Sequence, residues 1–157
     1  MANFPENRNQ GLLRPLKHPE MAQDEDGRNV LTHEYVVAVC EYNGQYTTPK
    51  CNNKLFLHYK GFDTIENLDA YTKCKAIWLE SNGIKKISGM DHMLSMKCLY
   101  LHQNKISKME GMLNFSKLSI LNLSHNQIRV VEGLENCLQL MTLDLSHNMI
   151  ENITDCE

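Results

Sequence analysis

Histidine and cysteine are the residues of this chain with the widest scope for chemistry, and their spacing gives the first indication of their role. The chain holds 7 histidines and 6 cysteines, and no two cysteines form a C-x-x-C pair. His125 and His147 could together bind a metal ion if they lay on neighbouring strands. No third ligand at a fitting spacing is evident, so we favour solvated or hydrogen-bonded histidines and expect no metal.

The common catalytic motifs are absent from the sequence. It contains no G-x-x-x-x-G-K-[ST], G-x-S-x-G or H-E-x-x-H string, so we expect no catalytic residue, no cofactor and no enzymatic activity. The net charge of −3 argues against nucleic acid or an anionic membrane as the main partner. The first 30 residues lack the apolar core of a secretory signal, which favours reduced cysteines in the cytosol.

The strongest signal in the sequence is a period of 22 residues that begins near Lys54. One apolar column, meaning the equivalent position in successive repeats, holds Leu55, Ile77, Leu99, Leu121 and Leu143. An asparagine column holds Asn82, Asn104, Asn126 and Asn148. The pattern L-x-x-L-x-L-x-x-N-x-I at this period is typical of the leucine-rich repeat.

The period predicts an α/β leucine-rich-repeat solenoid. We expect a right-handed coil with a parallel sheet on its concave face and 3-10 or short helices on its convex face. A capping helix is expected near residues 33–42, because Thr32 suits its start and Gly44 its end. The expected regions are a disordered tail over 1–30, the capping helix and loop over 31–53, and about five repeats over 54–157. No polar cap follows the last repeat, so we expect a fragment or a truncated gene model.

The asparagine column is expected to be structural. Each Asn follows a strand, where its side chain can bond to backbone groups that the turn leaves unpaired. Leaving such a group bare costs about 1–3 kcal/mol. We therefore expect Asn104→Ala and Asn126→Ala to destabilise the fold.

The outward strand positions form the candidate protein-binding face. One column holds Phe56, Trp78, Tyr100, Asn122 and Asp144, and the polar column beside it begins with His58, Glu80 and His102. Tyr59 follows at the edge of the same face. Three neighbouring exposed aromatics favour a partner-binding surface. The alternative is cross-strand packing that only stabilises the sheet.

Two strings near the first repeat resemble a known family. The segment Leu55-Phe56-Leu57-His58-Tyr59-Lys60-Gly61-Phe62 and the segment Ile77-Trp78-Leu79-Glu80-Ser81-Asn82-Gly83-Ile84 resemble the leucine-rich-repeat axonemal dynein assembly factors. This resemblance implies a non-catalytic protein of the cytoplasm and the cilium or flagellum, needed to preassemble axonemal dynein arms. It implies dynein subunits and assembly co-factors as partners, and we expect a monomer. Members of the family are longer, with a sixth repeat and a C-terminal cap.

Two other functions remain open at the level of sequence. Regulatory subunits of protein phosphatases carry the same 22-residue repeat, and so do light chains attached to dynein motors. The Lys60-Gly61-Phe62 string favours the assembly factors.

Overall fold

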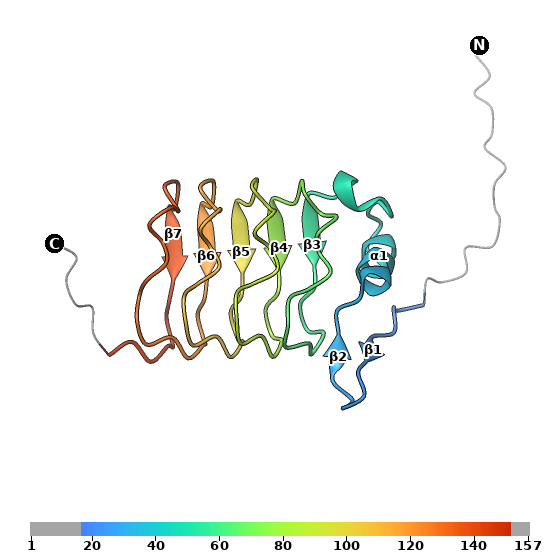
Figure 1. The fold of residues 1–157 in the computed structure, drawn as a ribbon, viewed down its shortest axis with the longest axis horizontal. Coiled ribbons are helices and arrows are strands. Elements are labelled where there is room, and N and C mark those ends of the chain that lie inside the picture. Colours follow the sequence, from blue (N-terminus) through green and yellow to red (C-terminus); the bar gives the residue numbers. More distant parts are fainter. Residues whose placement is uncertain (1–16, 152–157) are drawn as a thin grey trace, which may run out of the picture.

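A five-stranded parallel sheet forms the body of the molecule. The computed structural model describes residues 17–151. In chain order the elements are β1 Ala22–Gln23, β2 Asn29–Val30, α1 His33–Tyr42, the 3-10 turn η1 Pro49–Cys51, β3 Lys54–Phe56, β4 Ala76–Trp78, β5 Cys98–Tyr100, β6 Ile120–Asn122 and β7 Thr142–Asp144. The strands β3 to β7 lie in sequence order, and each is joined to the next by one turn of the coil (Figure 1).

The 22-residue period sets the register of the sheet. Leu55 pairs with Ile77, which pairs with Leu99, and the same column continues through Leu121 to Leu143. The first four of these side chains have no exposed surface. The repeats therefore share one continuous apolar core, as a solenoid requires, and the predicted fold class is confirmed.

The convex side has separate turns where the sequence predicted 3-10 or short helices. Within residues 54–151 the return segments are successive turns, in which Tyr71 N–H donates to Leu68 O and Cys74 N–H donates to Tyr71 O. The same pair of turns recurs in the next repeat at Met90, Met93 and Met96. A repeat of this length leaves few residues for the return path, so the chain makes separate i→i+3 turns instead of a continuous helix.

The helix α1 covers the N-terminal end of the core and occupies the residues that the sequence predicted. The Thr32 hydroxyl accepts a hydrogen bond from Tyr35 N–H at 3.1 Å, which caps the helix start. At the other end Gly44 has φ +69°, and Gln45 N–H donates to Cys40 O, which completes a Schellman motif. The face bearing Tyr35, Val36, Val39 and Cys40 is buried.

The segment before α1 corrects the prediction of a disordered tail over 1–30. Residues 1–16 lie outside the described part, but β1 and β2 pair as an antiparallel hairpin. The Asp24 carboxylate accepts from the N–H groups of Asp26 and Arg28, which fixes the turn. Asn29 then donates from its side chain to Lys60 O at 2.7 Å. Backbone pairing, side-chain caps and the packing of Met21 against the core order this segment.

The C-terminal end of the described coil is far less covered. Leu143 of β7 is 38% exposed, and Met141 beside it is 87% exposed. None of the helices in residues 17–151 has the length and apolarity needed to cross a membrane.

Candidate protein-binding face

The aromatic side chains of β3, β4 and β5 stack on one another. The ring centroids of Phe56 and Trp78 lie 4.7 Å apart, and those of Trp78 and Tyr100 lie 5.2 Å apart, with interplanar angles of 28° and 19°. All three side chains are half-buried. Burial, and then the nearby Cys98 and Glu80, raise the pKa of the Tyr100 hydroxyl. The stack therefore stabilises the sheet and still presents ring surface on the face.

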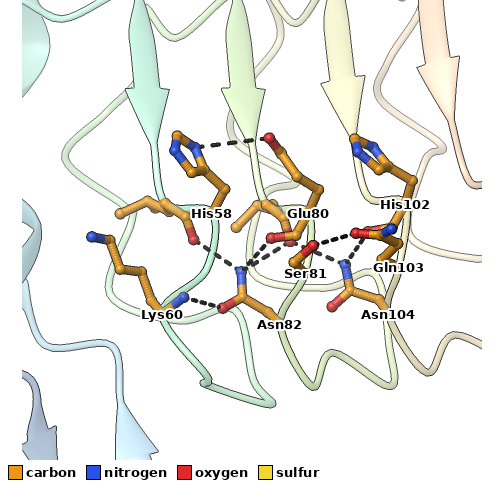
Figure 2. Close-up of polar contacts among 10 residues, drawn as sticks. His58, Lys60, Glu80, Ser81, Asn82, His102, Gln103 and Asn104 are labelled. Carbon is orange, nitrogen blue, oxygen red and sulfur yellow. Dashed lines mark hydrogen bonds and ion pairs between the residues drawn. The ribbon is translucent and has the colours of Figure 1, made fainter.

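A row of polar side chains runs beside the aromatic stack. His58, Glu80 and His102 follow the ends of β3, β4 and β5 and lie side by side (Figure 2). His58 Nδ1 lies 3.8 Å from Glu80 Oε1, which is too long for a hydrogen bond. We call these three residues the His-Glu-His row.

The same columns use their polar side chains differently in β6 and β7. The side-chain oxygen of Asn122 accepts from Ser124 N–H at 3.0 Å, and Asp144 accepts from Ser146 N–H at 3.0 Å. The Ser146 N–H holds the pKa of the Asp144 carboxyl below its usual value. These two predicted binding residues are thus already bonded within their own turns.

A third column marks the edge of the face, where the chain turns away from the strand. Its members share a left-handed backbone with φ between 54° and 56°, and they are Tyr59, Ser81, Gln103, His125 and His147. Tyr59 is 70% exposed. The rings of His125 and His147 stack at a centroid distance of 4.1 Å. Within residues 17–151 no three His, Cys, Asp or Glu side chains gather as a metal site would require.

The asparagine column forms a ladder of bonds between successive repeats. The Asn104 amide donates to Leu79 O and Leu101 O at 3.0 Å each, and its oxygen accepts from Ile84 N–H at 3.0 Å. Asn126 and Asn148 repeat this arrangement one and two repeats further on. Each Asn therefore satisfies backbone groups of its own repeat and of the preceding one.

The first rung of the ladder adapts to Lys60, which stands where an Asn is expected. Asn82 accepts from the N–H groups of Lys60 and Gly61 and donates to Leu57 O (Figure 2). The Lys60 carbonyl accepts from Asn29 of β2. Asn29 of the hairpin thus bonds to the backbone at the position where the first repeat lacks its asparagine.

Sequence reasoning missed a column of glycines at Gly89, Gly111 and Gly133. Each has a positive φ near 70°, and a Cβ at Gly111 would lie 2.0 Å from Ile87 O of the preceding repeat. Only glycine fits this close approach of two coils. The 22-residue spacing of these glycines was the signal that could have revealed them.

Comparisons with known proteins agree with this architecture. A family model described as "Leucine Rich Repeat" matches residues 117–137. A chain in the crystal structure of the Drosophila melanogaster SNF/U2A′ complex superposes with a TM-score of 0.59 and 27% identity, over 76% of this chain and 70% of that one. The present chain therefore has the leucine-rich-repeat fold.

Proteins with similar sequences point to one group of leucine-rich-repeat proteins. Dynein axonemal assembly factor 1 homolog of Drosophila pseudoobscura pseudoobscura is 45% identical over 56 residues, which is 36% of this chain and 4% of that protein. Dynein axonemal assembly factor 1 of Peromyscus polionotus is 44% identical over 57 residues, which is 36% of this chain and 9% of that protein. The resemblance to the leucine-rich-repeat dynein assembly factors is thereby confirmed, over a small part of those relatives' length.

Proposed function

We propose that this chain is a non-enzymatic protein-binding scaffold for the preassembly of axonemal dynein arms, and so for the motility of cilia and flagella. It acts in the cytoplasm and the cilium, and its partners are axonemal dynein subunits and assembly co-factors. The similarity to proteins named dynein axonemal assembly factor 1 carries this proposal.

The face around Phe56, Trp78 and Tyr100 is the proposed binding surface. Aromatic residues contribute strongly to protein interfaces because they bury a large area at a low cost in conformational entropy. The stack is already ordered by its own ring contacts, so docking a partner costs it little further entropy. The half-buried rings still offer apolar area to a partner.

Affinity capture from ciliated cells tests both parts of the proposal. The tagged chain is expected to recover axonemal dynein heavy or intermediate chains, and the pair Trp78→Ala and Tyr100→Ala is expected to lower that recovery about tenfold or more. Leu113→Ala, an apolar truncation at a site 70% exposed outside these columns, is the matched control and should retain recovery.

Three results would reject the proposal or one of its parts. Recovery of a phosphatase catalytic subunit without dynein chains would favour a phosphatase regulator instead. Undiminished dynein recovery by a correctly folded double variant would show that the aromatic stack only stabilises the sheet. Stable co-purification with intact dynein motors from axonemes, and none from cytoplasm, would favour a light chain.

A further inference from the structure

The His-Glu-His row carries three buried polar atoms that have no hydrogen-bond partner among the described residues. These atoms are His58 Nδ1, Glu80 Oε2 and His102 Nδ1. Buried polar atoms in folded proteins are nearly always bonded, and leaving one bare is costly. Three such atoms in one row, all on the proposed binding face, leave hydrogen-bonding capacity that no described residue uses.

Glu80 is the charged member of the row and is held away from solvent. Its side chain is 12% exposed, while that of His58 is 38% exposed. No lysine or arginine forms an ion pair with Glu80 in residues 17–151. A carboxylate this far from water gains from a hydrogen-bonded cation more than an exposed one does.

The charge of the two columns that meet at the row favours a cationic ligand. The aromatic column and the column of the His-Glu-His row contain two formal charges, those of Glu80 and Asp144, and neither column contains lysine or arginine. The rings of Trp78 and Tyr100 stand two residues before Glu80 and His102 on the same chain segments. Carboxylate, imidazole acceptors and flat aromatic rings therefore meet in one place.

We propose that the His-Glu-His row binds an arginine side chain of the partner protein, an inference that rests on the proposed function. The guanidinium carries five N–H donors in one plane, so it bonds to the Glu80 carboxylate and to a neighbouring imidazole nitrogen once these side chains rotate outward, while its face lies on an aromatic ring. A lysine ammonium is a compact point charge that cannot stack in this way. Phe56 and Tyr100 cover the two faces of Trp78, so the platform is the face of Tyr100 that Trp78 leaves free, and Glu80 supplies the counter-charge.

Trp78 is the only tryptophan of the chain, so its indole N–H gives a single NMR signal that reports on this site. N-acetyl-arginine methylamide is titrated into the intact chain while the single indole N–H signal is followed by NMR. The same titration is run with the citrulline analogue, which has nearly the shape of arginine but no charge, and with the lysine analogue. Glu80→Gln is compared with the matched control Glu110→Gln, since Glu110 pairs with Lys86 and Lys108 outside the row.

The arginine probe is expected to shift the indole signal to saturation in the wild type and in Glu110→Gln. Loss of the charged hydrogen bond should weaken binding about tenfold in Glu80→Gln and for the citrulline probe. Equal binding of arginine and citrulline probes to the wild type overturns the proposal even if Glu80→Gln fails to fold. Equal binding of the lysine probe overturns the choice of arginine.

This assay separates the inference from the proposed function. Because no partner protein is present, arginine binding is measured whatever the chain captures from cells. Saturable arginine binding without dynein recovery would reject only the dynein assignment. Dynein recovery that depends on Trp78, together with no arginine binding, would reject only the inference drawn here from the row.

Discussion

The two ends of the coil contain the same repeat in different surroundings. At β3 the core residue Leu55 is completely buried, because α1 and the neighbouring β4 cover it from both sides. At β7 the equivalent Leu143 is 38% exposed, since β6 is its one strand neighbour among residues 17–151. The environment of a repeat position is therefore set as much by the adjacent coil as by the residue itself.

The proposed binding face shows a matching contrast. In β3 to β5 the outward residues are aromatic and the row beyond them has unpaired polar atoms. In β6 and β7 the outward residues are Asn122 and Asp144, whose oxygens are taken by the backbone of Ser124 and Ser146. The row beside β3 to β5, near α1, therefore keeps polar atoms without hydrogen-bond partners. In β6 and β7 the polar side chains bond within their own turns.

The largest expected effect comes from the glycine column. Gly111→Ala places a Cβ within 2.0 Å of Ile87 O at a φ of +74° and should cost about 3–5 kcal/mol of unfolding free energy. In Gly133→Ala the added Cβ would lie 2.6 Å from Met109 O, in the less buried part of the coil near β7. We expect this variant to lose about 2 kcal/mol of unfolding free energy. Urea unfolding measures both. Equal losses would show that the last coil is held as tightly as the interior.

The asparagine ladder gives the next largest effect. Asn104 is 8% exposed, and Asn104→Ala should cost about 3 kcal/mol because Ile84 N–H loses its acceptor away from water, and Leu79 O keeps only its bond from Asn82. Asn148 makes the same bonds in a half-buried position, so Asn148→Ala should cost about 1 kcal/mol. Melting temperatures unchanged from the wild type would contradict the structural role of the ladder.

The smallest effect concerns pH and the two polar turns. The pKa of Asp144 is lowered in the folded chain, so its contribution to stability is present above its unfolded pKa and is lost as the pH falls through the lower folded value. Asp144→Asn gives β7 the amide that β6 has at Asn122 and removes this dependence. Urea unfolding at about pH 5 and about pH 3 should show a smaller loss of stability for Asp144→Asn than for the wild type. Identical losses would mean that Ser146 N–H does not favour the ionised carboxyl.

The sequence predicted those features that repeat. The apolar column, the asparagine column and the capping helix follow from spacing and from capping residues, because each signal is local or periodic. The hairpin of β1 and β2 was missed, because it is attached to the first repeat through contacts of Asn29 with Lys60 and Phe62, which are far from it in the chain. The unpaired atoms of Glu80 and His102 could not be predicted from the sequence either. Whether a polar atom finds a hydrogen-bond partner depends on which residues surround it in the folded chain.

The ladder determines how this molecule comes apart. Asn82 through Asn148 each clamp one coil to the coil before it and to no other. Among residues 17–151 the coil of β7 is the least buried, so loss of structure in this part of the chain is expected to begin at β7 and to advance one clamp at a time toward the helix-covered end. In hydrogen-exchange terms, amide protection should rise stepwise from β7 to β4, so the segment bearing the aromatic rings opens last.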